Sequence, residues 1–498
     1  MSSKKLKREV FINVSFAVAK ILGLLLMVRL ANDALPSLIG VFLLSRRVST
    51  TATNLLQLGT SQTVVRYVSM YSEDREKKAA YLTGAVCISA LAILVSVPLG
   101  FVMREPLAAL MYPDQTGKEW VAFWSVAVAA ATVLGFLAHS TYLAERRVVI
   151  ANIVELLNVN GFALLMLGAY RLSTLTEETM IVWLLAVNAI GVFCLSLAML
   201  SYYLYSNVDR HTIFETKWLD VFREILSYGL PRGVTAGLDM LLLLIAPWLL
   251  RYNSETAGNF VIALMLMRAI QAAIQPVARM AAVVAAKFVL KDDRESIRRG
   301  ARMIIGTSMY STLTGLAFVF PWLKTLLELW LGDPQRAESV YSFASILIWS
   351  IPALAVFRGL KPMIEVRWFR PYNLYALMGS FAVQLCLAYG LGLLMPYPQA
   401  VCLAMSFALC FLGGAALFAF RDALSPWGHW GIGRLTITVG LLMAINFGFA
   451  AAGQVILIIP AIAISIAVVV AAFRRRDSNP FLNDLLTFVR PSRPAAAT

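Results

Sequence analysis

The chain has 498 residues, of which 59% are hydrophobic and only 14% are charged. Soluble domains carry about 25% charged residues, so this composition excludes a soluble globular protein and indicates a polytopic membrane protein. A formal net charge of +15 would suit nucleic-acid binding. The membrane topology accounts for that charge, however, and we expect no nucleic-acid partner.

Apolar runs long enough to cross the roughly 30 Å hydrocarbon core of a bilayer recur along the whole chain. The fourteen runs cover approximately residues 10–31, 38–64, 79–103, 119–143, 148–170, 179–205, 227–250, 256–286, 303–326, 339–357, 372–394, 399–420, 435–452 and 455–473. We therefore expect an all-α, polytopic integral membrane protein with about 14 transmembrane helices. An even number of spans puts both termini on one side of the membrane.

The basic residues fall on one set of loops. If the N-terminus is inside, the inner loops and tails hold 30 of the 43 Lys and Arg residues, and the outer loops hold 5. Cytoplasmic loops of membrane proteins carry this excess of positive charge. We therefore predict a multi-pass protein of the bacterial inner (cytoplasmic) membrane, with both termini cytoplasmic.

The first two spans carry polar side chains in segments that are otherwise apolar. Lys20 shares one helical face of its span with Asn13. The second span has a stripe of polar residues, with one more at its edge: Arg46, Thr50, Thr53, Gln57 and Thr60, and then Arg47. A charge at the bilayer centre costs about 2.5–3.5 kcal/mol or more, so these stripes indicate a water-filled cavity for an anionic substrate.

The seventh and eighth spans repeat this pattern. Their stripes contain Tyr228, Arg232, Thr235 and Asp239 in one span, and Arg268, Gln271, Gln275 and Arg279 in the other. Each polar pair opens a group of six spans, as expected for a transporter whose site lies between two internal repeats. The predicted cavity residues are Lys20, Arg46, Arg47, Gln57, Arg232, Asp239, Arg268, Gln275 and Arg279.

This repeat divides the chain into two six-helix lobes with additional C-terminal helices. We predict an N-lobe over 1–205, a cytoplasmic linker over 206–226, a C-lobe over 227–420, and two last spans with a cytoplasmic tail over 421–498. In the linker, apolar residues recur at helical spacing beside charged ones, which predicts an amphipathic helix on the cytoplasmic surface.

Short motifs in both halves resemble those of the polysaccharide transporter (oligosaccharide or O-antigen flippase) family. This family belongs to the multidrug/oligosaccharidyl-lipid/polysaccharide exporter superfamily. The motifs are Gly40-Val41-Phe42, Leu58-Gly59, Arg66-Tyr67, the stretch from Glu224 to Pro231, and Gly258-Asn259-Phe260. The sequence differs from the family pattern at Arg232, where an apolar residue is usual.

The resemblance implies an inverted-V transporter that flips an undecaprenyl-pyrophosphate-linked oligosaccharide across the membrane by alternating access. It also implies that Lys20, Arg46 or Arg47, and Arg268 face the cavity. The implied partners are the lipid-linked oligosaccharide, membrane lipids, and the polymerase or ligase machinery of glycan assembly. The physical logic agrees, since Arg offers paired donors to a pyrophosphate and Lys offers a point charge.

Two carboxylates within the spans have alternative interpretations. Asp239 could pair with a cavity arginine or bind a coupling H⁺ or Na⁺, and the abundance of basic residues in the spans favours the pair. Glu155 could also couple to protons. Because Asn152 and Asn158 lie nearby in the sequence, an interhelical bond is the more usual role for it.

Two further polar positions suggest structural roles. His139 has no Cys, Asp or Glu in ligand spacing, so we expect it to pack without a ligand. Lys324 and Glu328 are four residues apart and are expected to form a surface pair.

Other functional classes remain open. A cation-coupled multidrug or small-molecule exporter of the same superfamily would normally have a carboxylate in the first span, where this chain has Lys20. A membrane enzyme of glycan assembly, such as a polymerase, would need catalytic residues in a large outer loop, and the outer loops are short. With no phosphate-binding loop and no metal-ligand spacing, we expect neither enzymatic activity nor a cofactor or metal.

Overall fold

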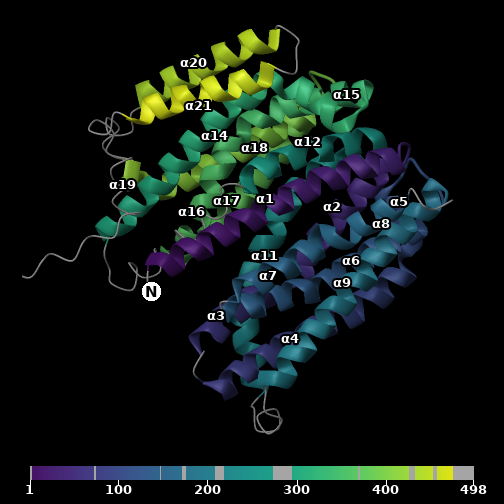
Figure 1. Cartoon of the computed structure of the whole chain (residues 1–498). Coiled ribbons are helices and arrows are strands. Elements are labelled where there is room, and N and C mark those ends of the chain that lie inside the picture. Colours follow the sequence, from purple (N-terminus) through teal and green to yellow (C-terminus); the bar gives the residue numbers. More distant parts are fainter. Residues whose placement is uncertain are drawn as a thin grey trace, which may run out of the picture. The chain divides into compact units, whose positions relative to one another are not determined.

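The structure is a computed structural model in which nine segments are described (Figure 1). They are residues 3–71, 74–145, 147–170, 175–207, 218–272, 294–367, 371–424, 432–451 and 457–474. Every regular element in these segments is a helix, which confirms the all-α prediction. Ten of these helices are long and apolar enough to cross a membrane, and two shorter apolar helices accompany them. The total of fourteen spans stays a prediction.

The chain divides into two compact units. The first, which we call the N-unit, contains residues 8–262, and the second, the C-unit, contains residues 263–498 together with residues 1–7. The predicted lobe and linker boundaries stay predictions. Residues 218–226 of the expected linker form the first turns of a helix that continues to Leu249.

The N-unit is built from the helices that run from α1 to the start of α12. They are α1 (Ser3–Ala34), α2 (Ile39–Leu56), α3 (Thr60–Met70), α4 (Arg75–Val102), α5 (Arg104–Met111), α6 (Glu119–Ala144), α7 (Val148–Leu156), the π-helix η1 (Leu157–Gly161), α8 (Phe162–Tyr170), α9 (Glu177–Asn207), α11 (Trp218–Leu249) and the start of α12 (Ser254–Ala272). Small and β-branched residues make α6 narrow and apolar, and it packs against α2, α3, α4, α7 and α9 (Figure 1).

One predicted span is interrupted. The sequence predicts a continuous helix over 38–64, but the chain turns between α2 and α3 at Leu58 and Gly59, which have φ angles of 48° and 77°. Glycine tolerates this left-handed conformation, whereas leucine adopts it at an energetic cost. The expectation of one continuous helix is therefore wrong at this turn.

The turn lies against α11, and close contact between the two backbones explains its glycine. A Cβ atom on Gly59 would lie 1.9 Å from the carbonyl oxygen of Gly229, and one on Gly233 would lie 2.6 Å from the backbone nitrogen of Gly59. A second glycine contact joins Gly40 of α2 to Gly258 of α12, where an added Cβ would lie 2.4 Å from the Gly40 Cα. Each of these two contacts thus joins a motif from the first half of the sequence to a motif from the second half.

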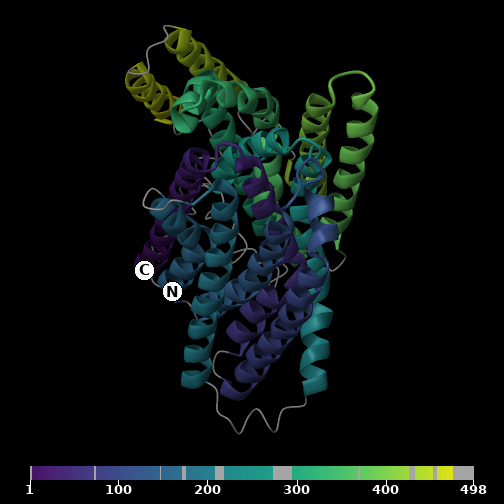
Figure 2. The same cartoon turned by 90° about the vertical axis from the view of Figure 1, so that its right-hand side faces the viewer.

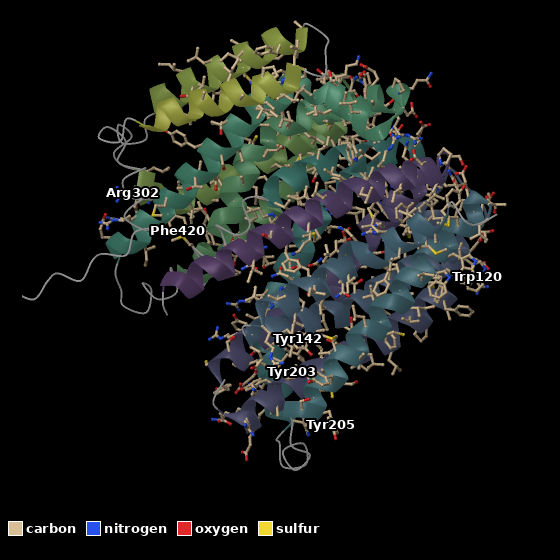
Figure 3. The ribbon with its side chains drawn as sticks, in the orientation of Figure 1. Trp120, Tyr142, Tyr203, Tyr205, Arg302 and Phe420 are labelled. Atoms are coloured by element: carbon tan, nitrogen blue, oxygen red, sulfur yellow. The ribbon has the colours of Figure 1, made fainter. Side chains whose placement is uncertain are left out.

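The connections of the N-unit meet at two ends. At one end, the Ser37 hydroxyl donates to Glu177 at 2.8 Å, and Lys118 pairs with Glu178 at 3.0 Å. At the other end, Glu145 accepts from Lys78 at 2.8 Å and from the Tyr203 hydroxyl at 2.6 Å. Figure 3 shows Tyr203 close to Tyr142 there, and their rings meet edge to face. The first group of connections is predicted to be outside, and the second inside.

The C-unit begins within α12 and consists of helical hairpins. Its elements are α14 (Arg294–Leu331), α15 (Pro334–Leu347), the 3₁₀ helix η2 (Ile348–Ser350), α16 (Ile351–Arg367), α17 (Tyr372–Gly392), α18 (Tyr397–Ala419), α19 (Arg421–Leu424), α20 (Ile432–Ala451) and α21 (Ile458–Arg474). The α17–α18 hairpin is the long green pair of helices in Figure 2.

Polar contacts hold the hairpins of the C-unit together. Asn446 of α20 is fully buried; it accepts from the Trp322 indole of α14 at 3.2 Å and donates to Ser465 of α21 at 3.0 Å. Lys324 forms its ion pair with Glu338 across the α14–α15 turn. The prediction that Lys324 pairs with Glu328 is therefore wrong, because the acidic partner of Lys324 is Glu338.

Candidate functional site

The centre of the candidate site is an ion pair between spans one and five. Lys20 of α1 binds the Glu155 carboxylate of α7, and their side chains are 18% and 14% exposed. His139 of α6 contributes its Nε2 atom, which lies 3.6 Å from the same carboxylate. We call Lys20, Glu155, His139 and the adjacent Arg46 the Lys20 cluster.

Arg46 reaches the same segment from α2. Its Nη2 donates to the carbonyl oxygen of Val159, within the π-helical turn η1. Its Nη1 is buried and has no hydrogen-bond partner among the described residues. A buried guanidinium donor without an acceptor is costly, so this atom is available to an anionic ligand.

Asparagines and glycines position the π turn. Asn160 donates to the Lys20 carbonyl oxygen at 3.1 Å, and a Cβ on Gly23 would lie 3.1 Å from the same amide. On the other side, a Cβ on Gly135 would lie 2.3 Å from the Asn158 side chain. Two glycines therefore let polar side chains of η1 lie between α1 and α6.

Arg47 takes a direction different from that of Arg46, as their angular separation on the helix predicts. It is 4% exposed, and its Nη2 donates to the Met240 carbonyl oxygen of α11 at 3.1 Å. Asp239, which precedes Met240, is buried on α11 as well. Gln57 is buried in the α2–α3 turn. These three residues lie along the α2–α3 contact with α11.

The remaining predicted site residues divide into two groups. Arg232 lies on α11 with its guanidinium carbon 3.8 Å from the centre of the Tyr228 ring, and its Nη1 donates to the Tyr228 carbonyl oxygen at 3.1 Å. The backbone of Arg268 is helical in α12, but its side chain lies outside the described part of the chain. Gln275 and Arg279 also lie outside the described residues.

His139 lies beside a carboxylate that its sequence context did not predict. It was expected to pack without a ligand because no acidic residue follows at a local spacing, whereas the structure places it beside Glu155 on the neighbouring helix. The spacing of the two residues from the turn could have predicted this contact. Both residues lie eight positions from Arg147, at the turn between α6 and α7, and such residues meet across an antiparallel helix hairpin.

The Lys20 cluster combines two basic side chains, one carboxylate and one imidazole. The carboxylate holds the Lys20 ammonium, while one Arg46 donor has no acceptor among the residues that the structure describes. Such a cluster can accept an anion on Arg46, and Lys20 can join if the anion displaces Glu155. The asparagine amides nearby offer donors and acceptors that suit hydroxyl groups.

Comparison with solved structures identifies the fold. No protein-family model and no curated protein sequence matches the chain. The structure of the lipid II flippase MurJ in an inward closed conformation matches with a TM-score of 0.64 at 13% identity, over 94% of this chain and 98% of that one. An inward-facing multidrug resistance MATE family transporter of the MOP superfamily matches with a TM-score of 0.63 at 12% identity, over 84% and 98%.

A third similar structure is notable for the polarity of its binding pocket. It is a MOP superfamily transporter from Pyrococcus furiosus, described as having a reverse polarity of its binding pocket that suggests a different function. It matches with a TM-score of 0.61 at 16% identity, over 85% of this chain and 96% of that one. The chain therefore has the fold found in MOP-superfamily transporters and the flippase MurJ.

Proposed function

We propose that this protein is a membrane transporter that moves an anionic, lipid-linked oligosaccharide of the undecaprenyl-pyrophosphate type across the cytoplasmic membrane by alternating access. The observation that carries the proposal is the basic side of the Lys20 cluster. Lys20 lies in a helix that is long and apolar enough to cross a membrane, and Arg46 lies in the second span expected from the sequence. The buried Arg46 Nη1 has no hydrogen-bond partner in the described part of the chain. Charged groups within membrane spans mark substrate pathways.

The chemistry of the substrate explains why such a site is needed. A pyrophosphate cannot cross hydrocarbon without compensating charge, and Arg can offer it two parallel donors. The Asn160 amide donates to the backbone carbonyl oxygen of Lys20, and the Asn152 amide donates to Asn13 on the same helix as Lys20; amides of this kind suit sugar hydroxyls. One structure of similar fold is a lipid II flippase, which supports a lipid-linked substrate for this chain as well.

A transport assay tests this proposal. The purified protein is placed in liposomes, and the appearance of a fluorescent, short-chain, diphosphate-linked oligosaccharide on the opposite leaflet is measured. Because hydrogen bonds to charged groups contribute about 1.5–3 kcal/mol, we expect Arg46→Ala to slow transport by about tenfold or more. Arg46→Lys keeps the charge and should retain part of the activity.

Arg29→Ala is the matched control. Arg29 also lies in a predicted span, but it is more exposed and is 3.7 Å from Asp33 of its own helix. Its loss should leave transport unchanged. Full transport by the Arg46→Ala protein would refute the proposed anionic site.

The second candidate is a cation-coupled multidrug exporter, and one specific observation favours it. Glu155 and His139 place an acid and an imidazole together within the spans, as proton coupling would require. Export of a cationic dye driven by a pH gradient, lost in Glu155→Gln but intact in Arg46→Ala, would establish this function in place of the first.

A further inference from the structure

Two arginines of the N-unit share one tyrosine ring. The guanidinium carbon of Arg66 in α3 lies 4.3 Å from the centre of the Tyr228 ring, and that of Arg232 lies 3.8 Å from it. Tyr228 and Arg232 lie on the same helix, whereas Arg66 lies more than 160 residues earlier in the sequence. Their meeting is therefore a product of the fold.

Backbone contact between glycines brings them together. Gly59 begins α3 against Gly229, the residue that follows Tyr228. Arg66 lies two turns farther along α3, and Arg232 lies one turn along α11 from Tyr228. The α3–α11 contact thus fixes the spacing of the two cations.

A stack of tyrosines supports this pair of arginines. Tyr67 meets Tyr228 edge to face at 5.8 Å and stacks on Tyr81 at 4.3 Å, and Tyr81 stacks on Tyr71 at 5.6 Å. The Tyr81 hydroxyl donates to Glu224, so the carboxylate one turn before Tyr228 already has a donor. The stack holds Tyr228 in place while that acid is engaged.

Among the described residues, the two guanidinium groups have no acidic partner. Within the described segments, neither Arg66 nor Arg232 forms an ion pair with a carboxylate. Arg66 is exposed and Arg232 is half-buried, so a ligand can reach both. A hydrogen bond to the Tyr228 side chain raises the pKa of Arg66, which keeps this group cationic. Cation–π stacking still leaves guanidinium N–H groups available to an oxyanion.

We propose that Arg66, Tyr228 and Arg232 form a second anion site, which binds the diphosphate headgroup of an isoprenoid-linked substrate at the predicted cytoplasmic end. The site shares no residue with the Lys20 cluster, and it lies where a substrate made in the cytoplasm would first meet the protein. The identity of its ligand rests on the proposed function. Two guanidinium groups spaced by one ring suit a group with two linked phosphates, and each can take one phosphate.

Direct binding to the full chain tests this site without transport. Radiolabelled farnesyl diphosphate is equilibrated by dialysis against the purified protein in a neutral detergent. We expect Arg66→Gln combined with Arg232→Gln to weaken binding by at least tenfold, since charge-assisted bonds are lost at two positions. Lysine at both positions keeps the charges and should restore part of the affinity, which also controls for misfolding.

Arg251→Gln is a closely matched control at the other end of α11. Its guanidinium carbon lies 4.8 Å from the Trp248 ring and 4.6 Å from the Tyr252 ring, and its Nη1 donates to the Trp248 carbonyl oxygen at 3.0 Å. This arginine thus has the same kind of stacking and backbone bond as Arg232, but no second arginine from the described segments shares its rings. Its loss should leave farnesyl diphosphate binding unchanged.

The outcomes separate this site from the proposed function. When Lys20→Ala and Arg46→Ala have first removed the Lys20 cluster as a binding site, a further loss of farnesyl diphosphate binding on adding Arg66→Gln and Arg232→Gln supports the second site even if transport fails. Unchanged binding in the Arg66 and Arg232 variant overturns it, even if transport holds. Competition by phosphatidylglycerol as strong as that by unlabelled farnesyl diphosphate also overturns it, because the site would then bind ordinary anionic membrane lipid.

Discussion

His139 and Glu155 face each other across the α6–α7 hairpin, with the imidazole Nε2 3.6 Å from the carboxylate that also holds Lys20. Three helices thus meet at one carboxylate. Two of them are joined by a short turn, whereas α1 comes from much earlier in the chain. The carboxylate therefore joins the α6–α7 hairpin to the distant helix α1, and its removal should weaken the packing of both.

The first prediction concerns this carboxylate. Glu155→Gln leaves the Lys20 ammonium without its counter-charge, and we expect the free energy of unfolding in mixed micelles to fall by about 1–3 kcal/mol. Combining it with Lys20→Met should recover part of the loss, because the uncompensated charge is then gone. Strictly additive losses would show that the two residues are not energetically coupled.

The second prediction concerns the glycine contact between α2–α3 and α11. Gly59→Ala adds a methyl group that would lie 1.9 Å from a backbone oxygen at a φ angle of 77°. We expect it to prevent folding or to destabilise the protein by more than about 3 kcal/mol, since overpacking adds to backbone strain. Thermal unfolding in detergent measures the loss.

Gly117→Ala separates these two effects. Gly117 has a φ angle of 72°, and nothing lies within 4 Å of an added Cβ. We expect this substitution to cost only about 1–2 kcal/mol, from the left-handed backbone alone. Equal losses at the two positions would mean that the close approach to Gly229 is unimportant.

The third prediction concerns the docking of α20 and α21 on α14. Asn446→Ala removes the partner of both the Trp322 indole and the Ser465 hydroxyl in an apolar setting. Interhelical hydrogen bonds in membrane proteins contribute about 0.6–2 kcal/mol, so we expect a loss of that size in unfolding free energy. Adding Trp322→Phe removes the indole N–H that has lost its acceptor. The free energy of unfolding of the double variant should therefore be close to that of Asn446→Ala alone. A larger further loss would indicate that packing of the indole ring dominates.

The fourth prediction separates two adjacent arginines. Arg47 is buried and its Nη2 donates to the Met240 carbonyl oxygen of α11, whereas Arg46 belongs to the Lys20 cluster and its Nη2 donates to the Val159 carbonyl oxygen of η1. Arg47→Met should lower the unfolding free energy by about 1–3 kcal/mol while the folded protein still transports. Arg46→Ala should do the reverse, with a small change in stability and a large loss of transport. Paired melting curves and liposome assays on both variants test this contrast.

Apolar run length was enough to predict an all-α membrane protein, because a bilayer-spanning segment must satisfy its backbone internally as a helix. Helical spacing also predicted that Arg46 and Arg47 diverge, and they contact η1 and α11 respectively. Periodicity could not reveal the break at Gly59. A single left-handed turn leaves the apolar pattern intact on both sides.

Partners across hairpins were harder to predict than partners along one helix. Lys324 was matched with Glu328 by the four-residue rule, but it pairs with Glu338, which lies as far beyond the turn at Leu331 as Lys324 lies before it. The same symmetry about the turn joins His139 to Glu155. The contact of Lys20 with Glu155 follows no spacing rule, because it depends on how α1 packs against the hairpin.

The π turn η1 has a consequence for the span that contains it. A π turn is an α-helix with one inserted residue, and that residue rotates everything after it by about 100°. Before the insertion, α7 packs against α6 and presents Glu155 to Lys20; after it, α8 packs against α9. A single extra residue thus lets one span change neighbours halfway across the membrane, so that its first half contributes to the polar cluster and its second half to the apolar bundle.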